Sequence, residues 1–408
     1  MRAQIRRVVG RRVGPALGWA RTLENFGRPA WLYRLGGAAP TGEQRFRPAR
    51  PVSDADLELC QRLVDAHRLA QAEAPPPSGM WSHSVFDERQ RRLREALGRG
   101  DPRAVADLLA AMFRSDFVLG LAPGSMGRER RPGPLARLSW LSSMDKLVAL
   151  AEALGTVRTE NPEQGPVGSA LRGGLDELVA AMEARLGLSL DFPHVGAAYG
   201  VVAGGRLITP ETPDQVYGAA RLRDVIEAYL PPADEPPRIV EIGGGYGGMA
   251  YWLLQMVDAR YVIVDLPIVG VLQGYFLAQA LGHDAVALHG EPPARVTIVP
   301  NHALASVQAP VDILANKDSL PEIPLDAAVG YLEWARSACR GAFYSNNQEG
   351  AAVFDGVAQN VVCELVERVG GFTRVRRDAS WLRRGYVEEV YLPVTGASAG
   401  PAAVNASI

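Results

Sequence analysis

Lysine is almost absent from this chain of 408 residues, since only Lys146 and Lys317 occur in a total of 43 lysines and arginines. Arginine, alanine, glycine and proline are abundant, so we interpret the scarcity as a coding bias without functional weight. Cysteine is scarce too: Cys60, Cys339 and Cys363 lie far apart and form no C-x-x-C pair. This argues against a disulfide framework and against a cysteine zinc site, and a reducing cytoplasm is the expected location.

Long apolar segments are also missing. No run reaches the roughly 20 residues that a membrane-spanning helix needs, and no hydrophobic leader follows the basic start of the chain. Hydrophobic residues make up 47% and charged residues 22% of the sequence, which is typical of a globular protein. The length favours two domains, and we expect them in the cytoplasm.

The charge is unevenly distributed along the chain. Residues 1–50 contain 11 arginines and only two glutamates, although the net charge of the whole chain is −2. Such a basic arm can contact an anionic membrane or an acidic partner, and a solvated helix is the simpler interpretation. The remainder is acidic and lacks interleaved basic and aromatic residues, so we do not expect a nucleic-acid partner.

The region after the basic arm is predicted to be mainly helical. Apolar residues recur at helical spacing over 53–72, where Ser53 or Asp54 can serve as the cap, and over 102–117, where Asp101 can. Further helices are expected over 142–155 and 174–187, each with a glycine at its end, and a short strand pair within 197–208. Segments rich in proline, glycine and charge predict loops at 74–79, 122–134 and 161–168.

A change of pattern follows the segment PPADEPP at 231–237, which cannot sustain a helix. Short β-rich runs then alternate with segments of helical length, including one over 351–370. Strands are expected at 238–242, 261–265, 296–300, 311–316, 341–346, 373–377 and 387–393, and the run at 284–289 competes with 296–300 for the third place. This pattern predicts an α/β fold with a Rossmann-like, seven-stranded, mostly parallel sheet whose last strand is antiparallel. The predicted divisions are the arm 1–50, a helical domain 51–235, the α/β domain 236–395 and a flexible tail 396–408.

The strongest motif is VEIGGGYGG at 240–248, where a predicted strand runs into Gly243, Gly245 and Gly247 and then into a helix. Such a turn lets backbone N–H groups and a helix N-terminus approach a ligand closely. The glycine spacing also satisfies the G-x-G-x-x-G of dinucleotide-binding folds. Glu241, two residues before the first glycine, gives the acidic-x-G-x-G-x-G pattern and favours S-adenosylmethionine over NAD. A structural turn without a ligand is the third interpretation.

Asp265 closes the second predicted strand of this domain. A carboxylate at that place can accept hydrogen bonds from both hydroxyls of a ribose, a feature that NAD and S-adenosylmethionine sites share. The alternative is that Asp265 caps the helix that starts at Pro267.

Four segments in order carry a resemblance to a known family: VEIGGGYGGMA, then VDLP followed by LQGYFL, then NKDSLPEIP, then YSNNQEG. With them, the chain resembles the sugar O-methyltransferase family of class I S-adenosylmethionine-dependent enzymes over roughly its last 190 residues. Looser likeness extends upstream through DKLVALAEALG, TENPEQG and YGAARLRDVI. The resemblance implies a methyltransferase sheet, S-adenosylmethionine as cofactor, and methyl transfer to a hydroxyl of a sugar, within a glycan, a glycolipid or a glycosylated small molecule.

The fourth predicted strand brings a polar group to the carboxyl edge of the sheet, where open α/β folds bind ligands. Transfer to a hydroxyl needs a group that takes its proton, and Asp318 or Glu322 can do so; otherwise Asp318 and Ser319 cap the turn before Pro321. We assign Asn316 to cofactor binding and Ser319 to acceptor binding. Lys317 lies in the same group.

Other candidates lie nearby in the predicted sheet. His302 can contact adenine or act as the base, although a lone histidine is more often a surface or hydrogen-bonded residue. Asn346 and Asn347 suit sugar hydroxyls, with turn formation as the alternative, and Tyr217 and Arg221 match the family's upstream helix or serve in packing. A divalent metal on Asp318, Glu322 and His302 matches no dedicated spacing. A non-sugar acceptor methylated at O, N or C, and an inactive S-adenosylmethionine-binding member of a biosynthetic complex, stay open.

Overall fold

The computed structural model describes residues 43–74, 84–115, 118, 134–159, 169–351, 353–354 and 357–394. The tail 396–408, nearly all of the basic arm and nearly all of the three loops predicted before residue 170 lie outside these residues. In the part of the chain that is described, no helix is long and apolar enough to cross a membrane.

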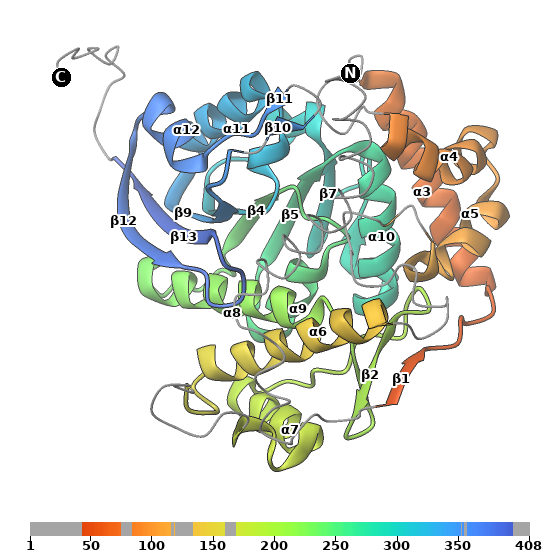
Figure 1. Cartoon of the computed structure of the whole chain (residues 1–408). Coiled ribbons are helices and arrows are strands. Elements are labelled where there is room, and N and C mark those ends of the chain that lie inside the picture. Colours follow the sequence, from red (N-terminus) through yellow and green to blue (C-terminus); the bar gives the residue numbers. More distant parts are fainter. Residues whose placement is uncertain are drawn as a thin grey trace, which may run out of the picture.

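An eight-stranded sheet forms the centre of the molecule, in the order β12-β13-β9-β8-β4-β5-β7-β6 (Figure 1). Its strands are β4 (Arg238–Ile242), β5 (Arg260–Asp265), β6 (Val286–Ala287), β7 (Val296–Pro300), β8 (Val311–Lys317), β9 (Cys339–Gln348), β12 (Phe372–Ala379) and β13 (Tyr386–Pro393). β13 pairs antiparallel with both of its neighbours, and all other pairs are parallel. The predicted Rossmann-like sheet with an antiparallel last strand is confirmed, and 296–300 takes the third place while 286–287 adds a short edge strand.

Helices cover both faces of this sheet, because alternate residues of the inner strands are apolar on each side. One buried cluster joins Ile239, Tyr261 and Ile313 to the helices α8 (Thr212–Tyr229), α9 (Gly248–Met256) and α10 (Pro267–Leu281). The other cluster joins Val240, Val264 and Leu314 to α11 (Leu325–Ala338) and α12 (Val362–Val369). Side chains at the carboxyl ends of the strands therefore divide between these two faces as well.

The N-terminal helices pack against the α8, α9 and α10 face (Figure 1). They are α3 (Asp54–Glu73), α4 (Ser84–Arg99), α5 (Pro102–Leu109), α6 (Pro134–Ala153) and α7 (Gly174–Leu186). α3 packs against α10 and α6 against α8. Arg62 of α3 also donates to Glu291 at 2.7 Å and to the carbonyl of Val286 at 2.8 Å, both beyond the end of α10. The helical region and the sheet thus share one buried core.

Local signals set several element ends as expected. Ser53 caps α3 in a capping box with Asp56, and the Asp101 carboxylate accepts from the Ala104 N–H at the start of α5. Gly155 and Gly187 follow α6 and α7 with φ of +70° and +72°, conformations that glycine adopts without strain. A small sheet also forms from β1 (Glu43–Phe46), β2 (Tyr199–Ala203) and β3 (Arg206–Ile208), which includes the predicted strand pair.

Three helix predictions are wrong in extent, and one of them, expected over 142–155, begins earlier, at Pro134. The helix expected over 102–117 ends at Leu109, because the Phe113 N–H bonds to the Gly196 carbonyl at 3.0 Å and its ring packs against Phe192 and Tyr246. The helix expected over 351–370 begins only at Val362, after the short strands β10 (Val353–Phe354) and β11 (Val357–Ala358). Asn360 bonds through its amide and its backbone to residues 320–323, and these long-range bonds hold the chain out of helix.

Candidate active site

The turn after β4 has the form that its glycines predict. Gly243, Gly245 and Gly247 have φ of +74°, +58° and +92°, which side chains rarely tolerate. A Cβ at Gly243 would lie 2.2 Å from Ser319 Oγ. We call residues 243–247 the glycine turn. It ends at α9, whose cap Gly247 offers no side-chain oxygen, so the first N–H groups of α9 have no side-chain cap and can bind a ligand.

Asp265 at the end of β5 lies beside this turn. Its Oδ1 accepts from the Leu266 N–H at 2.8 Å, and its Oδ2 accepts from Gln273 Nε2 at 2.7 Å. It is not the cap of α10, which begins after Leu266 without a side-chain cap. Burial raises the pKa of Asp265 to about 7, although bonds from Leu266, Gln273, Gly244 and Gly245 lower it. A carboxylate in this state gains much from a ligand that donates hydrogen bonds to it.

Gln273 connects the two predicted cofactor elements and was not singled out from the sequence. Its fully buried amide donates to Asp265 and also to the Gly245 carbonyl at 2.9 Å. Its own Oε1 is buried without a hydrogen-bond partner among the described residues. The only sequence signal was its place in LQGYFL, one of the segments that carries the family resemblance.

Glu241 lies beneath the glycine turn rather than at its surface. The carboxylate is 2% exposed and accepts a hydrogen bond from the Tyr261 hydroxyl at 3.0 Å. Burial raises the pKa of Glu241 to about 7, with a further rise from Asp265, whereas the Tyr261 bond and Lys317 lower it. The Asp265 carboxylate raises the pKa of Glu241 because two nearby negative charges repel each other.

A cavity opens beside Asp265 at the carboxyl ends of β5 and β7. The α10 residues Pro267 and Gly270, and Val299 and Pro300 of β7, line it together with Leu63 and His67 of α3, Leu288 and His289. Its walls are mainly apolar, and Asp265 supplies a carboxylate at one side. The cavity is small, about 30 Å³; its lining matches in chemistry an apolar ring attached to a hydroxyl-bearing group, and a ligand of that size would have to widen it.

Asn316 and Ser319, for which contacts with the cofactor and the acceptor stay predictions, form internal hydrogen bonds. The Asn316 amide donates to the Ile242 carbonyl at 2.8 Å and to Ser319 Oγ at 2.6 Å, and its oxygen accepts from Asn347. The Ser319 hydroxyl donates to the same Ile242 carbonyl at 2.8 Å. These bonds tie the end of β8 to the start of the glycine turn, so both side chains position the site.

Asp318 stands at the carboxyl end of β8 in an unusual backbone conformation, with φ of +61°. Its carboxylate accepts from Arg383, in the hairpin between β12 and β13, and from the Tyr386 hydroxyl at 2.6 Å. The Arg383 guanidinium also lies over the Tyr386 ring, 3.6 Å from its centroid. Glu322 lies near enough to raise the pKa of Tyr386, together with burial and Asp318. Asp318 and Glu322 thus share the region that their spacing predicts, and the identity of the base stays a prediction.

Further charged residues reach this place from α6 and α8. Lys146 of α6 forms an ion pair with Asp214 of α8. Burial raises the pKa of Asp214, but the positive charges of Lys146, Lys317 and Arg383 outweigh burial and lower this pKa to about 2. The group formed by Lys146, Asp214, Lys317, Asp318, Arg383 and Tyr386 is called the charged cluster below. Sequence reasoning missed Lys146, Asp214, Arg383 and Tyr386, because no local motif links them.

Asn346 and Asn347 are strand residues of β9, not turn residues. Both side chains are 3% exposed. Asn347 donates to Asn316 and Ser345, each at 2.8 Å, and Asn346 has a long bond of 3.5 Å to the Tyr344 hydroxyl. Asn346 pairs in register with Lys317, next to the charged cluster. A role in acceptor binding stays a prediction for both residues.

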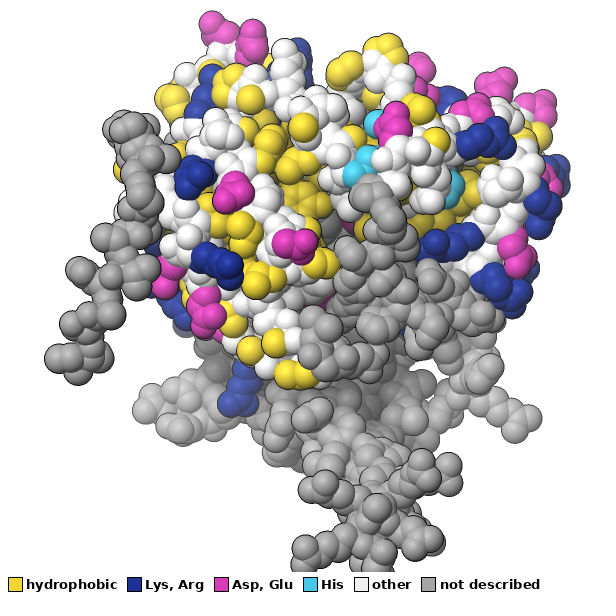
Figure 2. All heavy atoms as spheres, turned by 90° about the horizontal axis from the view of Figure 1, so that it is seen from above, with side chains coloured by type: hydrophobic (Ala, Val, Ile, Leu, Met, Phe, Trp, Pro, Cys, Tyr) yellow, Lys and Arg dark blue, Asp and Glu magenta, His cyan; other side chains and the backbone are white. Residues whose placement is uncertain are grey.

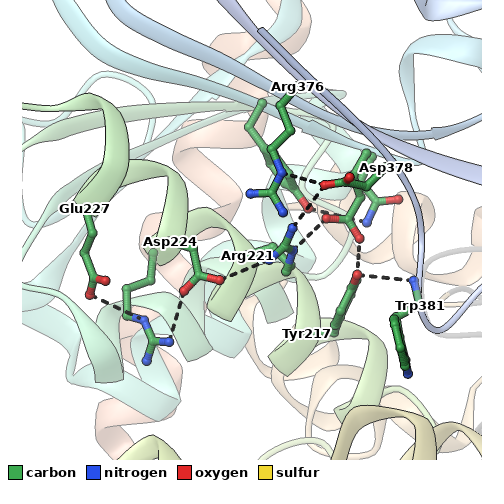
Figure 3. Close-up of polar contacts among 11 residues, drawn as sticks. Tyr217, Arg221, Asp224, Glu227, Arg376, Asp378 and Trp381 are labelled. Atoms are coloured by element: carbon green, nitrogen blue, oxygen red, sulfur yellow. Dashed lines mark hydrogen bonds and ion pairs between the residues drawn. The ribbon is translucent and has the colours of Figure 1, made fainter. Parts of the chain in front are cut away.

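Tyr217 and Arg221 belong to a buried network of hydrogen bonds and ion pairs between α8 and the last two strands (Figure 3). The Tyr217 hydroxyl donates to Glu388 and accepts from the Trp381 N–H at 3.2 Å. Arg221 donates to the other Glu388 oxygen at 2.8 Å and lies 3.7 Å from Asp378. Burial raises the pKa of Glu388, while Arg221 and Tyr217 lower it. Both residues hold the hairpin that carries Arg383, so they act on the site through position and not through the predicted direct contact.

His302 lies apart from Asp318 and Glu322. It follows β7, three strands from β8 in the sheet order, roughly 14 Å at usual strand spacing. The His302 ring lies 6.4 Å from the His289 ring between centroids, and its Nε2 lies 4.0 Å from the Glu73 carboxylate. Figure 2 shows histidine side chains near hydrophobic ones on one face of the molecule. Burial and His289 lower the pKa of His302. The geometry does not support His302 as the base and leaves its predicted place near an adenine open.

A metal on Asp318, Glu322 and His302 has no geometric support. Within the described ranges, no group of three or more histidine, cysteine, aspartate or glutamate residues is arranged to hold a metal ion.

The similar solved structures named below each cover less than half of the chain. No family model and no curated protein matches the chain. Similar solved structures include magnesium protoporphyrin IX methyltransferase from Synechocystis PCC 6803 with bound S-adenosylmethionine, 14% identical over 44% of this chain and 80% of that one, with a TM-score of 0.32. Another is the N-terminal domain of EvdMO1 in the presence of S-adenosylhomocysteine and D-fucose, 12% identical over 44% and 81%, with a TM-score of 0.30. A third is ribosomal protein L11 methylase from Lactobacillus delbrueckii subsp. bulgaricus, 10% identical over 43% and 76%, with a TM-score of 0.30. These likenesses carry no argument about function, and the α/β fold follows from the strand order itself.

Proposed function

We propose that the protein is an S-adenosylmethionine-dependent O-methyltransferase that transfers a methyl group to a hydroxyl of a sugar-containing acceptor. The observation that carries the proposal is the meeting of the glycine turn, the Asp265 carboxylate and the cavity beside it at the ends of β4 and β5. The motif resemblance supports the sugar class. The helical N-terminal region would help to select the acceptor, since α6 supplies Lys146 to the charged cluster.

The residues present fit S-adenosylmethionine. Close packing requires glycine in the turn, since a Cβ at Gly244 would lie 2.6 Å from Ile263 and 3.0 Å from Glu241, and the backbone N–H groups of such a turn can approach a ligand closely. Asp265 would accept from the ribose hydroxyls, and the apolar cavity walls would enclose the adenine. When bound, the cofactor supplies a methyl group on a positively charged sulfur. Asp265, Gln273 and the N-terminus of α9 would orient it.

The charged cluster would receive the acceptor. Ser319 contacts Gly243, so the end of β8 lies directly beside the glycine turn, and an acceptor hydroxyl held there would face the cofactor in line. A side chain of this edge would take the hydroxyl proton. Arg383 and Tyr386 orient Asp318 in this place.

Calorimetry and a transfer assay test the proposal in sequence. The purified protein is expected to bind S-adenosylhomocysteine and not NAD, and saturable NAD binding without a response to S-adenosylhomocysteine would contradict the cofactor. Methyl-labelled S-adenosylmethionine is then incubated with glycosides and sugar nucleotides, each paired with the deoxy analogue that lacks one hydroxyl. Label in the hydroxyl-bearing member alone supports O-methylation of a sugar. Label only in amines, carbon acceptors or non-sugar hydroxyls would support the alternative acceptor classes.

A further inference from the structure

The two lysines of the chain meet in the charged cluster. Lys146 belongs to α6 and Lys317 is the last residue of β8, yet both interact electrostatically with Asp214 of α8 and with each other. Every other basic side chain in the sequence, histidines aside, is an arginine. A coding bias explains why lysine is rare, but it does not explain why both lysines lie at one place.

The chemistry of the two basic side chains suggests what lysine supplies here. Arginine carries its charge at all accessible pH values, and its planar fork is better suited to binding a carboxylate or phosphate. Lysine has a compact amine that can lose its proton when its surroundings disfavour the charge. A fixed positive charge could come from arginine, so the presence of lysine at this place points to proton exchange.

Lys317 is placed beside the glycine turn by the packing of α8. Along β8, Ile313 and Ala315 belong to the cluster that contains α8 and α9, so Lys317 continues on that face. A Cβ at Gly218 of α8 would lie 3.2 Å from Lys317 Cδ and 3.0 Å from Met249 Sδ. Met249 is in the first turn of α9. The far half of the Lys317 side chain therefore passes close to the helix that begins at the glycine turn.

Charged groups face Lys317 from each element packed around it. These groups are Asp214 of α8, Lys146 of α6, Arg383 of the β12–β13 hairpin, Asp318 and, on β4, Glu241. Burial lowers the pKa of Lys317, Asp214 raises it, Arg383 lowers it, Asp318 raises it and Lys146 lowers it, with a net fall. Asp214 is paired with Lys146 and Asp318 with Arg383, so each acid shares its charge with a second cation, and the net effect on the pKa of Lys317 is a fall.

The hydrogen bonds distinguish Lys317 from its neighbours. Lys146 has an ion-pair partner in Asp214, and both Asp318 oxygens accept hydrogen bonds from Arg383 and Tyr386. Lys317 has no hydrogen bond or ion pair to any described residue. An unpartnered amine is a better proton acceptor than a carboxylate that already accepts a guanidinium.

We propose that Lys317, in its neutral form, accepts the proton of the acceptor hydroxyl during methyl transfer, with Lys146 and Asp214 setting its electrostatic surroundings. This inference rests on the proposed function and names the base within it. The hydroxyl oxygen forms a bond to the methyl carbon as the bond from that carbon to sulfur breaks. The hydroxyl proton passes to Lys317 Nζ, which leaves an ammonium, a methyl ether and S-adenosylhomocysteine. The ammonium then returns its proton to water.

The first test is direct because the chain contains only two lysines. Protein labelled with 13Cε-lysine gives two lysine signals, and a Lys146→Arg variant assigns the remaining one to Lys317. In the full-length protein with S-adenosylhomocysteine, the Lys317 signal is expected to titrate below the ordinary lysine value of about 10.4. A midpoint at or above that value overturns the proposal without any acceptor being known. If the protein does not bind S-adenosylhomocysteine, the proposed function has failed, and the same titration without ligand still tests Lys317.

The second test is kinetic. Lys317→Met and Lys317→Arg are expected to lose about 100-fold or more in kcat, the usual scale for a general base, while affinity for S-adenosylhomocysteine changes only a few-fold. The rising limb of the rate against pH should disappear, and methylamine should restore part of the activity of Lys317→Ala. Arg340→Met is the control, because Arg340 is an exposed residue at the start of β9, and this variant should behave as wild type.

Three outcomes of this test would overturn the assignment. Activity close to wild type in Lys317→Arg would mean that a fixed positive charge suffices. Loss of the rising limb in Asp318→Asn or Glu322→Gln, with Lys317→Arg unaffected, would make a carboxylate the base. A loss of cofactor affinity in Lys317→Met as large as its loss of kcat would mean that Lys317 binds the cofactor.

Discussion

The glycine turn, Asp265 and Gln273 all come from residues 241–273, whereas the charged cluster joins α6, α8, the end of β8 and the hairpin before β13. The first group is held together mainly by bonds of a buried amide to the backbone and to one carboxylate. The second depends on ion pairs between segments far apart in the sequence. A short contiguous segment can therefore build a cofactor site, while the acceptor site forms only when segments far apart in the sequence have packed together.

The largest effect is expected where the fold supports the charged cluster. Arg221→Met leaves Glu388, 3% exposed, without its ionic partner, and should lower the free energy of unfolding by roughly 3 to 5 kcal/mol. Denaturant titration measures this change. The hairpin that carries Arg383 should loosen as well, so kcat/KM should fall more than affinity for S-adenosylhomocysteine.

Glu388→Gln combined with Arg221→Met is the matched control, since it removes the unpaired charge and should recover much of the lost stability. If Arg221→Met alone is as stable as wild type, the buried network does not hold the hairpin, and the contrast between the two halves of the site fails.

Asp265→Ala should have the next largest effect and should be confined to the cofactor half. It removes an acceptor of charge-assisted bonds, each contributing about 1.5 kcal/mol or more, so cofactor affinity should fall by about 30- to 1000-fold. Calorimetry with S-adenosylhomocysteine measures it, and Asp318→Asn should stay within a few-fold of wild type. Equal losses in the two variants would show that the halves do not divide the work.

Gly243→Ala tests how closely the two halves are joined. The new methyl group would require φ of +74° and would lie 2.2 Å from Ser319 Oγ, so we expect a loss of about 2 kcal/mol or more in stability. Gly98→Ala is the control, because nothing lies within 4 Å of its added Cβ, and in a helix it should stabilise by about 0.5 to 1 kcal/mol. If Ser319→Gly does not relieve any of the Gly243→Ala loss, the contact between the halves is unimportant.

The smallest effect is a pH dependence of the cofactor half. Burial raises the pKa of Asp265 to about 7, so in the free protein this carboxyl binds a proton below that pH. A ribose that needs the ionised form must displace the proton, and affinity for S-adenosylhomocysteine should fall by up to about tenfold per unit as the pH drops below 7 and level off above it. Without ligand the sign is opposite: folding raises this pKa, so stability should fall as the pH rises from about 4 to 7.

Asp265→Asn should flatten the dependence of binding on pH. The pKa of Glu241 is raised as well, so Glu241→Gln shows how much of this dependence comes from Glu241 and how much from Asp265. An affinity that strengthens as the pH falls would contradict the role of ionised Asp265.

Local patterns in the sequence predict the cofactor half well. Short β-rich runs predicted β4 and β5, and Gly243, Gly245 and Gly247 marked the turn, because both signals act over a few residues. Gln273 was missed because its partners, Asp265 and the Gly245 carbonyl, become visible only when α10 is packed on the sheet.

The acceptor half could be predicted only in part. The end of β8 with Asp318 and Glu322 was found, since the carboxyl edge of a parallel sheet follows from the strand pattern. The bonds of Asn316 and Ser319 to the Ile242 carbonyl were not foreseen, because they cross between strands, and the contacts of both residues with cofactor and acceptor stay predictions. His302 was grouped with Asp318 because sequence order does not show how far apart β7 and β8 lie in the sheet.

The placement of β13 between β9 and β12 sets an order for assembly on the ribosome. The residues of β4, β5, β7, β8 and β9 emerge first, and until residues 386–393 follow them β9 is an unprotected edge that can pair with another chain. Arg383 and Tyr386, the partners of Asp318, are made at the same late stage. A nascent chain interrupted shortly before β13 could therefore already contain the complete cofactor motif, yet it would lack the groups that orient Asp318.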